Sequence, residues 1–402
     1  MRSIKKQIPN HQGILLVLFM LLISSCKQGA VLEFSVTEPV GISRELEYIE
    51  LEWRMPKLEN KNFVIDNGKG RVPGQIVGID STGKDFTIKA IFPIQIEANT
   101  TDSYTLYQGN ATFADRMVTV DHGNGLSIEN KYFLADFTAN KPNEGAPLYG
   151  GQLKTLHPKD QNDLLFKRKN INMHWAPNFQ AKGRPYRTLG HLNNHNAREK
   201  VGPLMVTIEK SGSVQDYPEI VLKAKYTFFA GLPFFRFTSE MTMKDEIELF
   251  LLRNDEMTLD SLFTHIHFPK GDTIEKLPLY KKNTFHDLKE TPIAANAPWL
   301  AFSNHVKKYH LGCIRLVYDN HSLSGNDSPL FEPHTKITAV GDGGRYWNRR
   351  LINEENTKLP AGSRYYEDNL YFVAGHTDSL TTYITKLKTR MQHPVTITIK
   401  KQ

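Results

Sequence analysis

Cysteine is nearly absent from this chain of 402 residues, which holds only Cys26 and Cys313. Cys313 lies between Gly312 and Ile314, in a stretch that predicts the interior of a strand. A thiol in such a place is expected to be buried and inert, because apolar surroundings disfavour the reactive thiolate. The scarcity of cysteine therefore disfavours a catalytic cysteine.

Sequence signatures of several enzyme classes are also missing. The chain has no Gly-x-Ser-x-Gly turn, no phosphate-binding loop, no dinucleotide-binding glycine pattern and no His-Glu-x-x-His motif. It has no internal repeat and no low-complexity segment, and no run after residue 26 approaches membrane-spanning length. Hydrolysis by a pair of carboxylates stays open, because such a pair needs no fixed spacing in the sequence.

The chain has no strong excess of one charge sign. Its formal net charge is +7, and three cations, Arg2, Lys5 and Lys6, lie in the first 25 residues, where no anion occurs. Removing these three leaves +4 for the remaining residues. So mild a charge excludes neither nucleic acid nor an anionic glycan as a partner.

The beginning of the chain has the pattern of a secretory signal. A basic start precedes the apolar run of residues 14–23, which is too short to span a bilayer, and two serines and Cys26 follow. Residues 23–26 resemble a bacterial lipobox, in which the cysteine becomes the lipidated first residue. We therefore predict a signal peptide over residues 1–25 and lipidation at Cys26.

A lipidated start predicts a protein tethered to the bacterial outer membrane. Residues 27–31 contain no acidic cluster of the kind linked by resemblance to surface export in Bacteroidetes, so we expect the anchor to face the periplasm. In this compartment an anionic oligosaccharide or polysaccharide is the expected partner and nucleic acid is not. With Cys26 lipidated, Cys313 would have no partner for a disulfide.

Alternation of apolar and polar residues with period two dominates the rest of the chain. It predicts strands over residues 85–92, 204–209, 235–241 and 395–399. A hairpin is predicted over residues 220–243, whose two halves flank Ala230-Gly231-Leu232-Pro233. Helical spacing is scarce and is best over residues 379–391.

This pattern predicts an all-β fold built around a large antiparallel β-sandwich. We assign residues 116–402 to that main sandwich. Residues 26–115 are assigned to a smaller N-terminal β module that ends near the turn at Gly109 and Asn110.

A first polar cluster surrounds His174 and Trp175, which are flanked by Asn172 and Asn178. A tryptophan ring stacks on a pyranose face, and amides hydrogen-bond sugar hydroxyls, so the cluster suits a sugar site. The alternative is a structural tryptophan with an exposed histidine beside it.

A second cluster contains Tyr186, Arg187 and His191, within the irregular stretch of residues 140–201. Arginine binds a carboxylate or sulfate with two hydrogen bonds, and histidine or tyrosine can then remove a neighbouring proton. The alternative is a solvated basic loop.

A third cluster begins with Arg253 and Asn254 and continues to His265 and His267. Arg253 also suits a purely structural ion pair with a neighbouring acid, because a lone buried charge is costly. His265 and His267 would share one face of a strand. They could bind a metal ion together, although a His-x-His pair alone is a signal of low specificity for a metal site.

A fourth cluster contains Tyr346, Trp347 and Arg349. Aromatic rings interleaved with arginine suit an anionic sugar chain, by stacking and by charge. They would also suit single-stranded nucleic acid, which the predicted compartment disfavours, or form an exposed basic turn.

These features together resemble polysaccharide-utilisation lipoproteins of Bacteroidetes, and more narrowly β-sandwich polysaccharide lyases and the uronate dehydratases of ulvan degradation. The residues behind the resemblance are the lipobox, His174-Trp175, Gly190-His191, Arg253-Asn254-Asp255-Glu256 and Thr264-His265. The resemblance implies β-elimination at a uronic acid, with a cation or amide holding the carboxylate. Loss of a sugar would make the protein a lyase, and loss of a hydroxyl a dehydratase.

On this hypothesis two sets of residues form the site. The predicted catalytic residues are His174, Tyr186, His191, Arg253 and His265. The predicted substrate-binding residues are Trp175, Arg187, Asn254, Tyr346, Trp347 and Arg349. No cofactor or metal is predicted, although a divalent metal stays open. The alternatives are a non-catalytic lipoprotein that binds anionic glycans and a glycoside hydrolase.

Overall fold

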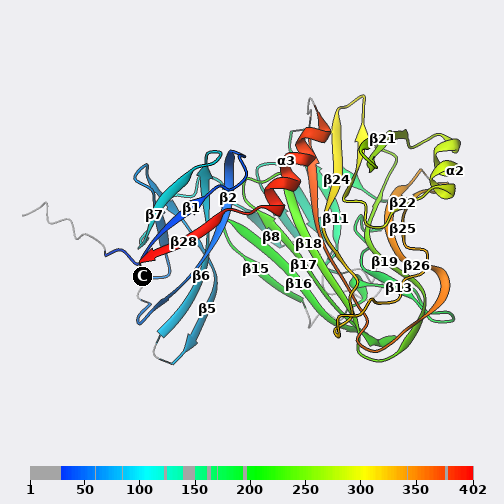
Figure 1. The fold of residues 1–402 in the computed structure, drawn as a ribbon, viewed down its shortest axis with the longest axis horizontal. Helices are drawn as coiled ribbons and strands as arrows, with labels where there is room; N and C mark the ends of the chain where they lie inside the picture. The colour runs from blue at the N-terminus through cyan, green and yellow to red at the C-terminus, as the bar shows by residue number, and fades with distance from the viewer. Residues whose placement is uncertain are drawn as a thin grey trace, which may run out of the picture.

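Antiparallel strands form most of the regular structure in the computed structural model, so the prediction of an all-β sandwich fold is confirmed (Figure 1). The structure describes residues 29–58, 60–83, 85–121, 125–138, 150–160, 164–169, 171–192, 197–341, 343–375 and 379–401. The predicted signal peptide and Cys26 lie outside the described residues. Within them, no helix is long and apolar enough to cross a membrane.

The N-terminal part of the chain forms a small sandwich with its own core, which includes Phe34, Trp53 and Leu106. One sheet has the order β28-β1-β7-β3-β4, and the other β2-β6-β5. The strands are β1 (Leu32–Thr37), β2 (Arg44–Met55), β3 (Phe63–Asp66), β4 (Arg71–Pro73), β5 (Gln75–Thr82), β6 (Asp85–Ile96), β7 (Thr101–Gln108) and β28 (Thr396–Lys401).

The last strand of the small sandwich comes from the opposite end of the chain. β28 pairs antiparallel with β1, which places Ile397 opposite Val36 (Figure 1). The sequence assigned the whole of residues 116–402 to the main sandwich, and for residues 396–401 that assignment is wrong. A period-two pattern predicts the strand but says nothing of which sheet it joins.

The large sandwich has a nine-stranded sheet of order β15-β16-β17-β18-β27-β24-β23-β20-β21. Its strands are β15 (Ala197–Val201), β16 (Met205–Val214), β17 (Tyr217–Phe229), β18 (Phe234–Met243), β20 (His265–Lys270), β21 (Thr273–Pro278), β23 (Trp299–Asn304), β24 (Tyr309–Asp319) and β27 (Arg364–Ala374). The predicted hairpin is confirmed, since β17 and β18 pair antiparallel across a turn that contains Gly231 at φ 69°.

Two further sheets complete the large sandwich. The six-stranded sheet has the order β14-β13-β19-β26-β25-β22, and the five-stranded sheet β12-β11-β10-β9-β8. The six are β13 (Asn178–Gln180), β14 (Arg187–Thr188), β19 (Ile247–Leu259), β22 (Ile293–Ala294), β25 (His334–Ala339) and β26 (Arg345–Leu359). The five are β8 (Val118–Asp121), β9 (Leu126–Glu129), β10 (Phe133–Phe137), β11 (Leu153–Pro158) and β12 (Phe166–Lys167).

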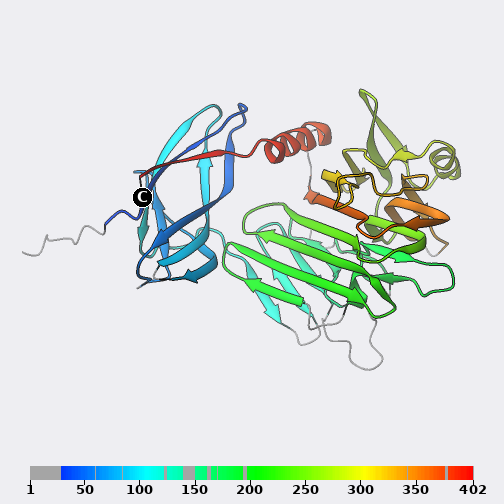
Figure 2. The ribbon, with the colours of Figure 1, turned by 60° about the horizontal axis from the view of Figure 1, so that its bottom comes forward.

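One apolar core fills the space between these sheets and contains buried side chains from all three, such as Phe235, Trp347 and Phe133. Cys313 is fully buried in this core, as predicted, and burial raises the pKa of its thiol. The strand β27 is buried on both faces, because α3 covers the outer face of the nine-stranded sheet around Phe372 (Figure 2).

The helix predicted over residues 379–391 is confirmed as α3 (Leu380–Gln392), and the side chain of Ser379 caps its N-terminus. A second helix, α2 (Lys282–Glu290), was not predicted from the sequence; it lies near β25 (Figure 1). It is short and buries only Thr284 and Leu288, so its sequence carries little helical periodicity.

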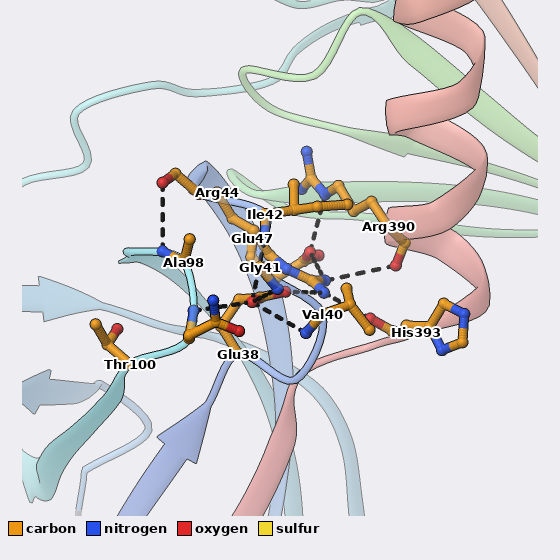
Figure 3. A network of polar contacts seen from close by, with 12 residues as sticks. Glu38, Val40, Gly41, Ile42, Arg44, Glu47, Ala98, Thr100, Arg390 and His393 are labelled. Atoms are coloured by element: carbon orange, nitrogen blue, oxygen red, sulfur yellow. Dashed lines mark hydrogen bonds and ion pairs between the residues drawn. The ribbon is translucent and has the colours of Figure 1, made fainter.

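A buried arginine of the small sandwich, Arg44, connects it to the end of α3 (Figure 3). Arg44 donates to Glu38 Oε1 at 3.1 Å and to the His393 carbonyl at 2.5 Å. Burial works against the charged form of Glu38, but backbone N–H groups and Arg44 outweigh it and lower its pKa to about 2. The chain between α3 and β28 is therefore fixed to the small sandwich by a hydrogen bond from the Arg44 guanidinium as well as by strand pairing.

Candidate functional site

The strand β19 carries a β-bulge that sends consecutive polar residues to opposite faces of the six-stranded sheet. Arg253 pairs with Arg350, Asn254 pairs with Arg349, and the next pair is Met257 with Trp347. Asp255 and Glu256 thus face the single residue Asn348, and Asp255 takes the left-handed conformation at φ 46°. The bulge divides this polar sequence between an outer face and the core.

Strand register gathers the outer side chains into rows across β19, β26 and β25. Arg253, Arg350 and His334 form one row, and Thr258, Tyr346 and Thr338 form another. Lys336 and Asn348 lie between these rows. Residues directly opposite one another share a face of the sheet. We call the group formed by Trp175, Tyr186, Arg253, Lys336, Tyr346 and Arg350 the outer patch. Trp175 and Arg350 are buried, and the other four side chains are partly exposed.

Aromatic rings lie beside the guanidinium of Arg253 in this patch. Arg253 lies 5.9 Å from the Tyr186 ring centroid, and that ring is 6.1 Å from Trp175. Arg253 also pairs with Glu256 at 3.3 Å, and Glu256 accepts a hydrogen bond from Asn178 at 2.9 Å. The sequence clusters around Trp175, Tyr186, Arg253 and Tyr346 therefore meet on one surface.

The outer patch concentrates positive charge. Partial burial lowers the pKa of Lys336, and the neighbouring charges of Arg350, Arg253 and Lys289 lower it further. For Arg253, burial acts to lower the pKa, but Glu256, Tyr186 and Tyr346 reverse the balance and raise it. A site with several cations so close together favours an anionic ligand.

A cavity of about 870 Å³ opens between α2 and the strands β25 and β26. Its polar lining includes Lys289, Glu332, His334, Lys336, Asn353 and Glu354. Glu354 pairs with Arg350 at 2.6 Å, and this contact lowers the pKa of the glutamate. Lys336 and His334 thus belong both to the rows of the outer face and to the wall of the cavity.

The inner face of the same sheet holds a fully buried polar network centred on Asp255. Its carboxylate accepts hydrogen bonds from Arg315 Nε at 2.6 Å, Trp347 Nε1 at 3.1 Å and the Tyr371 hydroxyl at 2.9 Å. The Glu367 carboxylate accepts hydrogen bonds from Arg349 Nη1 at 3.2 Å and from the backbone N–H of Asp255 at 3.1 Å. We call these residues the inner network.

The two carboxylates of the inner network have opposite pKa shifts. Burial acts to raise the pKa of Asp255, but Arg315 and Arg349 outweigh it and lower the pKa. Burial raises the pKa of Glu367 to about 7, against the effect of Arg349 and with a contribution from Asp255. Asp255 is therefore the charged partner of Arg315, and Glu367 binds its proton more tightly.

The predicted catalytic His174 lies inside the core and has no exposed surface. Its Nδ1 contacts the Tyr226 hydroxyl, and its ring packs against the Phe237 ring with centroids 4.5 Å apart. Burial lowers the pKa of His174 to about 3. A substrate on the surface cannot reach this imidazole, so its position contradicts a role as base or acid.

Four of the predicted substrate-binding residues are also buried, and one of them, Trp175, lies in the outer patch with 9% of its surface exposed. Asn254, Trp347 and Arg349 lie on the inner face with the network, and none is more than 1% exposed. A contact between these side chains and a sugar is contradicted by their burial. Strand alternation is the reason, because Trp347 and Arg349 point away from the face of Tyr346, and Asn254 points away from that of Arg253. The bulge at Asp255 then keeps Asp255 inward and turns Glu256 outward.

Arg187 and His191 are partly exposed at the β13–β14 edge of the six-stranded sheet and hold local structure. Arg187 Nε donates to Asp216 at 2.6 Å, and His191 Nδ1 accepts from the Thr188 N–H at 3.1 Å. Burial and then the nearby Arg187 lower the pKa of His191 to about 4. Arg187 also donates from Nη1 to the backbone carbonyl of Tyr186 at 3.0 Å, so it borders the outer patch. The predicted roles of Arg187 and His191 stay untested.

The predicted catalytic His265 belongs to the other sheet, on β20, where its Nδ1 lies 2.9 Å from Thr264 Oγ1. The structure thus does not bring it to the outer patch. The sequence analysis did not assign Lys336 and Arg350 of the patch, or His334 beside Arg350, to the site. Period-two alternation over residues 334–339 was the available signal, since it places His334 and Lys336 on one face.

No protein-family model matches this chain, and no curated protein resembles it in sequence. Among the solved structures that are similar in fold are the following two. An alpha-mannosidase from Enterococcus faecalis V583 has a TM-score of 0.51 and 12% identity over 92% of this chain and 46% of that one. A protein in glycosyl hydrolase family 38 from Enterococcus faecalis has a TM-score of 0.52 and 12% identity over 92% and 47%.

The chain therefore spans about half the length of these two structures, and so low an identity shows the fold alone. Both are named as glycoside hydrolases, which act by hydrolysis and not by elimination. The prediction of a carbon-oxygen lyase or uronate dehydratase is wrong on this comparison. That prediction depended on a resemblance of general features of the chain to the lyases and dehydratases, and no diagnostic motif supported it.

Proposed function

We propose that this chain binds a carbohydrate that carries carboxylate or sulfate groups, at the outer patch and the adjoining cavity. The observation that supports this most is the combination of aromatic rings with clustered cations on one face of the six-stranded sheet. Tyr186 and Tyr346 supply partly exposed rings, and Arg253 and Lys336 supply partly exposed charge. The buried Arg350 adds a third positive charge behind them. The similarity of fold to an alpha-mannosidase supports carbohydrate as the ligand class.

The chemistry of the patch matches such a ligand. Aromatic side chains pack on the apolar face of a sugar ring, while a few placed polar groups set its orientation. Guanidinium groups bind carboxylate or sulfate with two parallel hydrogen bonds. The cavity of about 870 Å³ is within the range of sites that enclose small ligands.

Binding of defined oligosaccharides, measured by calorimetry, tests this proposal. Uronate-containing and sulfated oligosaccharides should bind the full chain more tightly than neutral manno-oligosaccharides, and added salt should weaken the binding. Tyr346→Ala and Lys336→Met should each weaken it by roughly tenfold. Lys358→Met is the matched control, because Lys358 is exposed at the far end of β26, the strand that carries Tyr346, and lies beside Glu246.

Failure to bind any of these glycans would contradict the proposal. So would equal affinities in wild type, Tyr346→Ala and Lys336→Met.

Glycoside hydrolysis is a second candidate, because three glutamates, Glu290, Glu332 and Glu354, line the cavity. Hydrolysis needs one carboxylate that stays ionised, and Arg350 lowers the pKa of Glu354 in that direction. Release of reducing ends from a bound oligosaccharide, abolished in both Glu332→Gln and Glu354→Gln, would support hydrolysis. Binding with no product would leave a binding protein.

Lipid anchoring at Cys26, in an outer membrane and facing the periplasm, is the proposed location. The support is the basic start, the short apolar run and the lipobox-like residues 23–26. Metabolic labelling with palmitate should mark the protein and should fail for Cys26→Ser. Equal labelling of both would contradict the anchor.

A further inference from the structure

Four histidines meet on the outer face of the nine-stranded sheet, away from the outer patch. His265 and His267 project from β20, His305 follows β23, and His310 lies on β24. Strand register places Ser303 between His265 and His310 in one row. The sequence indicated only the pair on β20, because sheet pairing and a turn bring the other two.

Two of these imidazoles have nitrogens at a distance that suits a shared ion. His267 Nε2 and His305 Nε2 lie 3.4 Å apart, and the two rings are nearly parallel, with an interplanar angle of 3°. Zinc bonds to histidine nitrogen are about 2.0–2.1 Å long, so neighbouring ligands of a tetrahedral ion lie about 3.3 Å apart. The observed separation therefore matches two ligands of one ion.

A third histidine of the group holds one of these two rings in place. His265 packs against His305 with ring centroids 4.1 Å apart and helps to fix that ring.

We propose that His267 and His305 bind one divalent transition-metal ion, such as Zn²⁺, Ni²⁺ or Cu²⁺, through their Nε2 atoms. Imidazole suits these three ions. In the described part of the chain, no three His, Cys, Asp or Glu side chains are placed to hold one ion together. Water completes the coordination of the proposed two-histidine site, which does not depend on the proposed carbohydrate binding.

Lys276 is the group that opposes this ion. Its ammonium lies 3.1 Å from His305 Nδ1, so Nδ1 accepts from it and the hydrogen of that ring is on Nε2. Metal binding requires the hydrogen to move to Nδ1, and the ammonium must then turn away. Lys276 is exposed and has room to do so. Removing this lysine should therefore tighten the site.

Calorimetric titration of the full chain, purified without a histidine tag, tests the site with Zn²⁺, Ni²⁺ and Cu²⁺ separately. We expect one ion per chain, an affinity on the order of tenfold lower in His267→Ala and in His305→Ala, and a higher affinity in Lys276→Met. His286→Ala is the matched control, since His286 is exposed on α2. Circular dichroism confirms that each variant is folded.

With Cu²⁺, electron paramagnetic resonance should show coupling to two imidazole nitrogens, and each histidine variant should lose one of them. The proposal is overturned if no ion binds the wild type, if both histidine variants bind as tightly as wild type, or if Lys276→Met binds more weakly.

Discussion

The two faces of the six-stranded sheet carry the same kinds of side chain with different consequences. On the inner face, Asp255 is wholly buried with Arg315. On the outer face, one residue further along the bulge, the buried Glu256 pairs with Arg253, which is partly exposed. Composition therefore does not separate a structural ion pair from a binding surface. The direction in which the backbone turns at the bulge separates them.

Burial makes the inner charges depend on one another. The desolvation of two ions costs several kcal/mol each, and only close geometry with further hydrogen bonds offsets it. Asp255 meets this condition with Arg315, Trp347 and Tyr371. The inner network thus fixes how β19, β24, β26 and β27 pack, whereas the outer patch leaves its charges within reach of a ligand.

Breaking the inner network should produce the largest effect. Asp255→Ala leaves the Arg315 guanidinium buried without its carboxylate. We therefore expect the free energy of unfolding to fall by about 3–5 kcal/mol. Urea unfolding followed by fluorescence measures this loss. The control is Asp216→Ala, which removes the exposed partner of Arg187 and should cost no more than about 1 kcal/mol. Equal losses in the two variants would contradict the comparison.

The contribution of a carboxylate to the free energy of unfolding should change with pH in opposite directions on the two faces of the sheet. The pKa of Glu367 is raised from 4.5 to about 7, so the folded state holds its proton more tightly than the unfolded state. Its contribution therefore falls as pH rises from about 4.5 to about 7, by roughly 3 kcal/mol. Glu367→Gln should remove that slope. Unfolding free energies at pH 5 and pH 8 measure it.

On the outer face, Arg350 lowers the pKa of Glu354, so this carboxylate stabilises the fold above pH 4.5 and the contribution is lost as pH falls further. Glu354→Gln should therefore destabilise slightly at pH 7 and less at pH 3. A loss of the same sign and pH dependence in Glu367→Gln would remove the contrast.

Much of the fold followed from the sequence, because period-two alternation marks strands wherever one face is buried. The hairpin around Gly231 and the helix after Ser379 were predicted for this reason. The pairing of β28 with β1 was not, since alternation does not encode a partner strand. Four of the six residues of the outer patch, Trp175, Tyr186, Arg253 and Tyr346, were named from the sequence, and their roles stay predictions.

Trp347, Arg349 and Asn254 were placed on the same predicted surface as their neighbours, and there is a physical reason why they lie in the core instead. Trp347 and Arg349 alternate with Tyr346 in sequence, so they point to the opposite face of β26 and into the core. A cluster of aromatic and basic residues in a strand must belong to two surfaces. Asn254 follows the same rule beside Arg253, and the bulge at Asp255 adds a turn that no spacing rule predicts.

The smallest effect on stability is expected at Lys336, and its sign sharpens the comparison. Partial burial and the charges of Arg350, Arg253 and Lys289 lower the pKa of this lysine, so its positive charge is less favourable in the folded state. Lys336→Met should leave the free energy of unfolding equal or slightly higher at pH 7, while binding of an acidic glycan weakens. Urea unfolding and calorimetry on the same sample measure both. A stability loss as large as that of Asp255→Ala would show that the outer patch holds the fold together as the inner network does, whereas unchanged stability with weaker binding separates the two faces by function.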